Sequence, residues 1–159
     1  MIKEISCFKA YDVRGRIPSE LNEDVAYRIG AGVASYFGAE SVVVGYDVRP
    51  SSIDILNALT KGINSKGAKV YSIGLCGTEE IYFATNHLET DAGVMITASH
   101  NPADYNGLKI VGKGAKPVSM DSGLGEIKKI ADQSESNLVA EPNMEVVDIK
   151  AAYIEKLLE

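Results

Sequence analysis

The amino-acid sequence predicts an α/β fold, a three-layer α/β/α sandwich with a mostly parallel or mixed sheet of about four strands. Three observations support this class. Apolar residues recur with the helical period in separate segments, short runs rich in β-branched residues lie between those segments, and glycine or polar residues separate one from the next. Strands that alternate with helices along a chain are typical of layered α/β proteins, because the connecting helices cover the faces of the sheet.

Two segments in the first half of the chain predict amphipathic helices. Asn22 is suited to cap the first helix, and Gly38 is a suitable residue for its end. The apolar stripe of this helix consists of Val25, Ile29, Val33 and Phe37. The second helix is expected to start at Ser51 or Ser52 and to end just before Gly67. Its inward residues are expected to be Ile55, Leu56, Leu59 and Ile63.

Four short segments are expected to form the sheet, because they are apolar and rich in β-branched residues, as buried strands are. They are residues 41–45, 70–73, 92–97 and 108–111. The dipeptide Asn106-Gly107, a common turn signal, is expected to lead into the last of these strands. Two shorter helices are expected in addition. They cover residues 79–86 and residues 121–131, the latter with Ile127 and Ile130 inward.

Composition excludes several classes of function. The chain has 159 residues, of which 45% are hydrophobic and 24% charged, values typical of a globular domain. Its net charge of −6 argues against a nucleic-acid partner, and no apolar run is long enough to span a membrane. Cys7 and Cys76 lie far apart in the sequence, which indicates buried thiols in a reducing compartment. A cytoplasmic protein with neither nucleic-acid nor membrane partners is therefore expected.

The last third of the chain indicates a boundary. Residues 133–142 are polar and are expected to form a loop or linker. Residues 150–159 then begin an amphipathic helix whose apolar stripe has no following segment to cover it. We therefore expect one domain over residues 1–140, followed by a linker and the start of a helix over residues 141–159 that leads into an absent second domain.

The residues after the third expected strand are the strongest candidates for a functional site. Residues 97–102 read Thr-Ala-Ser-His-Asn-Pro, so an apolar strand passes into small polar residues and a proline. Ligands of open α/β sheets bind beyond the carboxyl ends of the strands. Ser99 is thus placed to hold a phosphate or to carry one on its hydroxyl. The donors that follow it are His100, Asn101 and Lys109. The alternative is that these polar residues only satisfy backbone groups of a turn.

Four segments, in order along the chain, match short motifs that occur together in one enzyme family. Residues 9–15 read Lys-Ala-Tyr-Asp-Val-Arg-Gly, and residues 45–49 read Gly-Tyr-Asp-Val-Arg. Residues 77–84 read Gly-Thr-Glu-Glu-Ile-Tyr-Phe-Ala. Residues 97–102 are followed by Tyr-Asn-Gly-Leu-Lys at residues 105–109. Together these segments resemble the α-D-phosphohexomutases, the family of phosphomannomutases and phosphoglucomutases, and the last segment resembles the phosphoserine signature of that family.

The resemblance implies that the chain is the N-terminal fragment of an enzyme with four domains. Tyr46 replaces the first arginine of the family's Gly-Arg-Asp-x-Arg motif, and Glu79 replaces a proline. The Asp-Gly-Asp-Gly-Asp metal loop of the second domain has no match in the sequence, and neither do the sugar and phosphate loops of the third and fourth domains. The remaining domains of the same polypeptide are thus expected as partners, and the isolated fragment is expected to be inactive.

The resemblance also implies an activity, that of an isomerase of carbohydrate metabolism. Such an intramolecular phosphotransferase interconverts hexose 6-phosphate and hexose 1-phosphate through a hexose bisphosphate intermediate, and mannose is the expected sugar. The segments look most like those of bacterial phosphomannomutases, which supply GDP-mannose for surface polysaccharide biosynthesis. Ser99 would carry phosphate in the resting enzyme and, through that phosphate, would supply one ligand to a Mg²⁺ cofactor.

The other site residues take their expected roles from the same resemblance. Arg14 would contact the phosphoryl group and the substrate with its planar fork, or else form an ordinary surface ion pair. Lys109 would contact the substrate as a charge or general acid–base, or else be a solvated lysine at a strand end. His100 would orient the substrate or move a proton, or else be a hydrogen-bonded loop histidine. Tyr11 and Asn101 are expected to line the substrate side, Asn101 chiefly by shaping the loop.

Two further residues and two other functions complete the expectations. Asp47 and Arg49 are expected to brace the strand-end loop from behind. Adjacent Ser99 and His100 suggest a serine hydrolase, but neighbours on an extended loop point apart, and a Gly-x-Ser-x-Gly elbow is absent. A non-catalytic α/β binding domain is the other alternative. Phosphate on the Ser99 peptide would indicate the mutase, whereas fluorophosphonate labelling of a serine would indicate the hydrolase.

Overall fold

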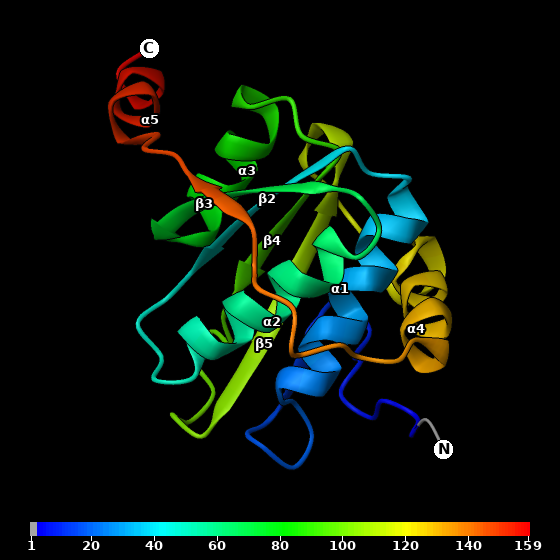
Figure 1. Cartoon of the computed structure of the whole chain (residues 1–159). Coiled ribbons are helices and arrows are strands. Elements are labelled where there is room, and N and C mark those ends of the chain that lie inside the picture. The colour runs from blue at the N-terminus through cyan, green and yellow to red at the C-terminus, as the bar shows by residue number, and fades with distance from the viewer. Residues whose placement is uncertain (1–2) are drawn as a thin grey trace.

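The structure, a computed structural model, describes residues 3–159 (Figure 1). Within these residues a mixed sheet of seven strands lies between helices on both sides, which confirms the predicted α/β class and its layers. The strands are β1 (Val13–Arg16), β2 (Ser41–Tyr46), β3 (Lys69–Leu75), β4 (Ala92–Ile96), β5 (Tyr105–Gly112), β6 (Lys116–Pro117) and β7 (Met144–Val146). The α-helices are α1 (Glu23–Phe37), α2 (Ser52–Asn64), α3 (Thr78–His87), α4 (Leu124–Gln133) and α5 (Lys150–Leu157), and the 3-10 turns are η1 (Lys113–Ala115) and η2 (Met120–Ser122).

The order of the strands brings two loops together at one edge of the sheet. The strand order is β1-β5-β4-β2-β3-β7, and β6 pairs with β5. β4, β2, β3 and β7 run parallel, whereas β5 is antiparallel to β1, β4 and β6. Tyr46 of β2 and Ile96 of β4 are partners in the register, so these two strands end at the same level. The loops that follow them are therefore neighbours at the edge where open α/β sheets bind ligands.

The two faces of the sheet carry separate hydrophobic cores. α1, α2 and α4 pack on one face, in a cluster that includes Val42 and Val44 of β2. α3 packs on the other face, in a smaller cluster that includes Val43 of the same strand and Met95 of β4. Successive side chains of a strand point to opposite faces, so one β-branched run contributes to both cores. This burial on both faces explains why β2 is apolar throughout and does not alternate with polar residues.

The predicted caps define the ends of α1. The Asn22 side chain accepts a hydrogen bond of 2.9 Å from the backbone N–H of Val25, as an N-cap residue does. Gly38 adopts a left-handed conformation with φ of 56°, which glycine reaches without the steric cost of a Cβ atom. The predicted helices of the first half, the short helix before β4 and the C-terminal helix are all present as α1, α2, α3 and α5.

α1 and α2 cross with their backbones in close contact. A Cβ atom on Gly30 of α1 would overlap the carbonyl oxygen of Leu59 in α2. Conversely, a Cβ atom on Gly62 of α2 would overlap the carbonyl oxygen of Tyr27 in α1. Each helix thus presents a glycine to the other, and the pair packs more tightly than larger side chains would permit.

The structure corrects several details of the predicted elements. The sheet has seven strands, not about four, because β1, β6 and β7 are short strands of mixed polarity that lack the apolar run of a buried strand. Asn106 and Gly107 do not form a turn, since both lie within β5 and pair with Gly15 and Arg14 of β1. The helix expected over 121–131 is divided into η2 and α4, and Ile130 is only partly buried.

The end of the chain forms a loop, a strand and a helix. Residues 134–143 form an irregular loop, as predicted, and β7 then joins the outer edge of β3. α5 lies beside α3, where the ring of Tyr153 packs edge-on against Phe83 with 5.4 Å between centroids (Figure 1). Ile154 and Leu157 remain exposed. No helix within residues 3–159 combines the length and the apolar character needed to cross a lipid bilayer.

Candidate active site

The loop between β4 and β5 carries the predicted serine at the sheet edge. β4 ends at Ile96, and Ser99 is exposed three residues later. Ser99 has a φ of 55°, a left-handed conformation that residues with a Cβ atom rarely adopt. Its backbone N–H donates a hydrogen bond of 2.9 Å to Oγ1 of Thr97. An unfavourable backbone conformation persists only where the surroundings hold it, and such positions concentrate at functional sites.

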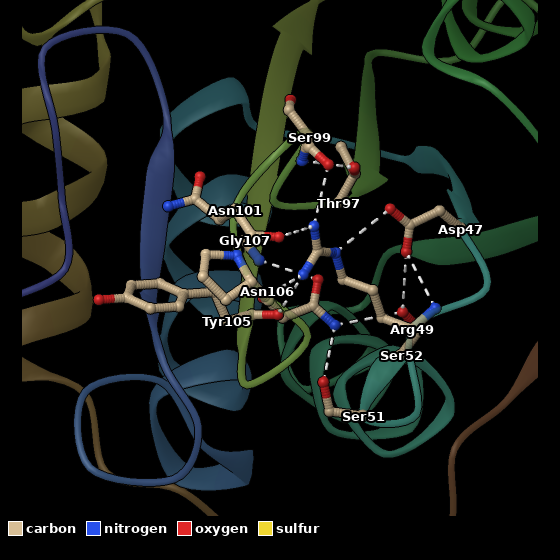
Figure 2. Close-up of polar contacts among 11 residues, drawn as sticks. Asp47, Arg49, Ser51, Ser52, Thr97, Ser99, Asn101, Tyr105, Asn106 and Gly107 are labelled. Carbon is tan, nitrogen blue, oxygen red and sulfur yellow. Dashed lines mark hydrogen bonds and ion pairs between the residues drawn. The ribbon is translucent and has the colours of Figure 1, made fainter.

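The surroundings that hold this loop are centred on Arg49 (Figure 2). Nη2 of Arg49 donates to the backbone carbonyl oxygens of Ser99 and Asn101, at 2.9 and 2.8 Å. Nη1 donates to the carbonyl oxygens of Pro102 and Tyr105, at 2.7 and 2.9 Å. We call this set of four hydrogen bonds the Arg49 clamp. It joins the β2–α2 turn to both ends of the loop that carries Ser99.

A second layer of polar contacts surrounds the Arg49 clamp on its side toward α2 and β5 (Figure 2). Asp47 lies 3.6 Å from Nε of Arg49 and accepts a hydrogen bond of 3.4 Å from the Ser52 hydroxyl. Asn106 is fully buried, and its side-chain Nδ2 donates to Oγ of Ser51 and Ser52 at 2.8 and 3.1 Å. A buried amide needs such partners, because an unpaired buried polar group is costly. These contacts tie β5 to the start of α2.

Arg14 approaches the same loop from β1. It pairs with Gly107 in the register, and Thr97 donates its backbone N–H to the carbonyl oxygen of Gly107 at 2.9 Å. The side chain of Arg14 is 42% exposed; its Nε lies 3.1 Å from Asp12, and its Nη1 lies 3.4 Å from Oδ1 of Asn101. Among residues 3–159 its Nη2 makes no hydrogen bond, so this guanidinium retains N–H groups that can bind an anion.

Lys109 lies on the same face of the sheet as Arg14. Lys109 is two residues beyond Gly107, the partner of Arg14, and residues i and i+2 of a strand share a face. Its own partner in β4 is Met95, which belongs to the core beneath α3. The two cationic side chains thus lie on the same face of two neighbouring strands, β1 and β5. Within the described part of the chain, the amino group of Lys109 has no ion pair.

The other predicted residues differ in how close they come to this arrangement. Asn101 is in the loop and contacts Arg14 through its side chain. His100 is exposed next to Ser99, and Tyr11 is 79% exposed in the turn before β1. Over residues 3–159 the structure shows no side-chain hydrogen bond for His100, so its ring is joined neither to Ser99 nor to an acid, as a serine hydrolase would need. The structure therefore brings Arg14 into contact with Asn101, in the loop that carries Ser99, and places Lys109 on the same face of the sheet as Arg14.

Asn106 is the residue of this region whose role the sequence analysis missed. The dipeptide Asn106-Gly107 predicts a turn, but Asn106 lies within β5, and its side chain contacts Ser51 and Ser52 next to the Arg49 clamp. The sequence does contain one indication of this role, because Asn106 comes just before the apolar residues of a strand. A polar side chain that is buried at such a position needs a hydrogen-bond partner. Glycine is required at position 107 for a structural reason, because a Cβ atom there would lie only 2.8 Å from the carbonyl oxygen of Thr97.

The carboxylates near the loop do not form a metal site by themselves. Asp12 is paired with Arg14, and Asp47 with Arg49. Across residues 3–159, no group of three or more His, Cys, Asp or Glu side chains is arranged to hold a metal ion. Mg²⁺ takes octahedral oxygen coordination, and Ser99 offers it one oxygen. The residues present therefore do not fit a complete magnesium site.

The cysteine at this edge of the sheet is not activated. Cys76 follows β3, and its backbone N–H donates to the carbonyl oxygen of Tyr46 at 2.9 Å. Burial raises the pKa of its thiol to about 12, with a smaller contribution from the Glu80 carboxylate. A thiol of this pKa is protonated at neutral pH, and the thiolate is the nucleophilic form. Cys76 therefore offers no thiolate nucleophile at this edge of the sheet.

Comparison with known proteins finds a family match over most of the chain. A profile described as phosphoglucomutase/phosphomannomutase, alpha/beta/alpha domain I, matches residues 6–138. The chain belongs to this family. The resemblance expected from the four motifs is thus confirmed over most of the chain, and the match includes the β4–β5 loop, the Arg49 clamp and Arg14.

Similar proteins carry the same family name. The chain is 47% identical to a phosphomannomutase of Salmonella typhimurium over 98% of its own length and 35% of that protein. It is 50% identical to a phosphomannomutase of Klebsiella pneumoniae, over 83% of its length and 84% of that protein. The fold matches the crystal structure of a phosphoglucomutase/phosphomannomutase family protein from Burkholderia thailandensis with a TM-score of 0.83 and 34% identity, covering 99% of this chain and 36% of that one. The chain thus spans about a third of the length of most of these relatives.

Proposed function

We propose that this chain is the phosphoserine-bearing part of a phosphohexose mutase, and that Ser99 carries the phosphoryl group. The observation that carries the proposal is the exposed Ser99, which has a left-handed conformation just beyond the carboxyl end of β4. It lies in the same loop as Asn101, whose side chain contacts Arg14, an arginine with N–H groups still free to bind an anion. Membership of the family supports the same assignment. The mutase interconverts hexose 6-phosphate and hexose 1-phosphate through a hexose bisphosphate.

The transfer step can be written for the residues of this chain. The bond between Ser99 Oγ and phosphorus breaks while a sugar hydroxyl oxygen forms a new bond to phosphorus. The proton of that hydroxyl ends on Ser99 Oγ, which restores the serine. In the second half of the cycle Ser99 Oγ forms a bond to the phosphorus of the other phosphate, and the bond from that phosphorus to the sugar oxygen breaks. The serine proton ends on that sugar oxygen. Phosphoryl transfer of this kind depends chiefly on positioning and on charge stabilisation, so the residues around Ser99 have those two tasks.

The neighbouring residues take their proposed roles from their positions. Phosphoserine carries about −1.5 to −2 charges, and Arg14 binds its oxygens with the N–H groups that Asp12 and Asn101 leave unused. Lys109, on the same face, supplies a second positive charge and takes part in moving the proton. His100 orients the substrate from its exposed position next to Ser99. Tyr11 and Asn101 line the side from which the sugar approaches.

Other parts of the protein complete the site in this proposal. The Salmonella typhimurium relative is about three times as long as the match, so we assign the sugar-binding groups to segments beyond it. Mg²⁺, when bound, would neutralise part of the charge of the phosphate; the Ser99 phosphate would supply one oxygen ligand, and those segments would supply the others. The 159 residues alone are then expected to show no turnover. The names of the similar proteins favour mannose as the sugar, and the two unpaired cysteines favour a cytoplasmic location.

The proposal is tested on Ser99 itself, in the protein at its full encoded length. Mass spectrometry of the purified protein is expected to find one phosphate on the peptide that contains Ser99. Ser99→Ala is expected to abolish the conversion of mannose 6-phosphate to mannose 1-phosphate while thermal unfolding remains unchanged. Ser6→Ala, at another exposed serine, is the matched control and is expected to retain activity.

Three results would contradict the assignment. Normal mutase activity of Ser99→Ala would remove the phosphate carrier from the proposal. Labelling of Ser99 by a fluorophosphonate, with hydrolysis of an ester, would indicate a serine hydrolase instead. A peptide without phosphate, from a protein that binds but does not convert hexose phosphates, would indicate a binding domain.

A further inference from the structure

The Arg49 clamp holds the backbone of the loop that contains Ser99, the proposed phosphate carrier. We propose that Arg49 is a positioning residue of the phosphoryl transfer: it aims the Ser99 hydroxyl by holding the loop carbonyls, and it does not bind the phosphate itself. This inference rests on the proposed function, because it concerns the aim of the hydroxyl that carries the phosphoryl group. The inference goes beyond the proposed function, because it assigns an effect on the reaction rate to a side chain that contacts only other protein groups.

The contacts of Arg49 leave its guanidinium no free edge. The Nη1 and Nη2 groups donate to four backbone carbonyl oxygens of the loop, all within 2.9 Å. Nε faces Asp47 at 3.6 Å, and the side chain is only 11% exposed. A guanidinium has five N–H bonds in a fixed plane, and here its N–H-bearing edges face the loop carbonyls and Asp47. Arg49 therefore has no N–H group directed at a ligand in solvent.

Two of the four carbonyls belong to Ser99 and to Asn101, on either side of His100. Because Nη2 of Arg49 binds both carbonyl oxygens, it sets the orientation of the peptide planes around Ser99. That orientation includes the φ of 55° at Ser99. Figure 2 shows the carbonyl of Ser99 directed at Arg49 and the side-chain oxygen directed away from it. The clamp thus fixes the direction of the hydroxyl through the backbone, with no contact between Arg49 and that hydroxyl.

Charge is not the means by which Arg49 acts in this inference. Its positive charge is partnered by Asp47, which is itself held by the Ser52 hydroxyl. Arg14 is the arginine with N–H groups available for an anion. Lysine at position 49 would keep the charge but would present three donors at a single nitrogen, which cannot replace a planar fork that reaches four carbonyls. Substitution by lysine therefore separates geometry from charge.

The test compares Arg49→Ala, Arg49→Lys and Arg16→Ala in the protein at its full encoded length. Displacement of reacting groups by about 1 Å can reduce a rate about 100-fold, so kcat of Arg49→Ala is expected to fall about that much. Arg49→Lys is expected to lose at least tenfold, because the fork is lost while the charge remains. KM for the hexose phosphate is expected to change little, since Arg49 does not touch the sugar. Arg16, an exposed arginine on β1, is the matched control and is expected to keep normal kcat.

A second measurement separates positioning from a general loss of structure. Added guanidinium ion in the millimolar range is expected to restore part of kcat to Arg49→Ala, because it can occupy the vacated plane, and to leave Arg49→Lys unchanged. If Arg49→Ala does not fold, Arg49→Lys decides alone. Full activity of Arg49→Lys, or of a folded Arg49→Ala, would overturn the inference, whereas an active Ser99→Ala would overturn the proposed function. The two failures are thus distinguishable.

Discussion

Two arginines near the Ser99 loop have the same side chain and different surroundings. Arg49 is 11% exposed and is surrounded by backbone carbonyls, whereas Arg14 is 42% exposed and contacts Asp12 and Asn101 with part of its guanidinium. Burial and the number of occupied N–H groups therefore separate an arginine that shapes the loop from one that can bind a ligand. At the scale of single residues, this difference determines what each substitution is expected to change.

Arg14→Ala is expected to slow phosphoryl transfer far more than it weakens the fold. Hydrogen bonds to charged groups contribute about 1.5–3 kcal/mol, which corresponds to a rate loss of roughly tenfold to 100-fold. The free energy of unfolding is expected to fall by about 1 kcal/mol or less, because an exposed ion pair contributes little. Single-turnover rates and denaturant unfolding of the protein at its full encoded length measure the two effects. An unchanged rate with a large loss of stability would show that Arg14 is a structural ion-pair residue.

At the scale of elements, the crossing of α1 and α2 depends on two glycines. Glycine normally weakens a helix by about 1 kcal/mol relative to alanine, and both helices tolerate this cost at their contact. Gly30 and Gly62 each face a backbone carbonyl of the opposite helix. A backbone atom cannot rotate away as a side chain can, so the helices would have to move apart to admit a methyl group. α2 begins directly after the β2–α2 turn that contains Arg49. Its packing against α1 therefore also supports the position of Arg49 against the Ser99 loop.

Gly62→Ala is expected to destabilise the protein despite its better helix propensity. Overpacking costs about 1–3 kcal/mol, and the overlap here is with the Tyr27 backbone, so a net loss of at least about 2 kcal/mol is expected. Gly77→Ala, where a Cβ atom would meet open space, is the control and is expected to cost about 1 kcal/mol or less. Denaturant unfolding gives both values. A stabilised Gly62→Ala would mean that the two helices are not in backbone contact.

At the scale of the whole molecule, the buried thiol of Cys7 and the partly buried thiol of Cys76 make stability depend on alkaline pH. Burial raises the pKa of the Cys7 thiol from 9.0 to about 11, and that of Cys76 to about 12. At a pH between 9.0, the pKa of each thiol in the unfolded chain, and its raised pKa in the folded protein, the unfolded chain releases protons that the folded protein retains. Stability from this source is fully present below pH 9.0 and is lost as the pH rises toward 11.

Cys7→Ala is expected to flatten this dependence. The free energy of unfolding of the unsubstituted protein should fall between pH 9 and 11 by an amount of which Cys7 supplies on the order of 1–2 kcal/mol. Cys7→Ala will itself lower stability by leaving a cavity, so the slope with pH is compared and not the absolute value. Ser6→Ala, at the exposed neighbour, should keep the original slope. Identical slopes for all three proteins would show that the Cys7 thiol ionises equally in both states.

Much of this molecule can be predicted from consecutive residues. The capping residues Asn22 and Gly38, the apolar stripes of α1 and α2, and the β-branched run of β2 each follow from preferences that act within a few residues. Residues 97–102 likewise carry the serine loop as one continuous segment. For the same reason the sequence alone led to the α/β class, to the family and to Ser99 as the candidate residue.

Tertiary structure alone decided which distant groups meet. The short strands β1, β6 and β7 exist because a neighbouring strand offers hydrogen bonds, and no apolar run announces them. Asn106 has turn propensity, yet it lies in a strand because its buried amide finds two serine hydroxyls at the start of α2. The carbonyl partners of Arg49 lie 50 to 56 positions away. Local preference cannot specify such contacts, because their free energy arises only once the sheet has brought the β2 and β4 loops to one edge.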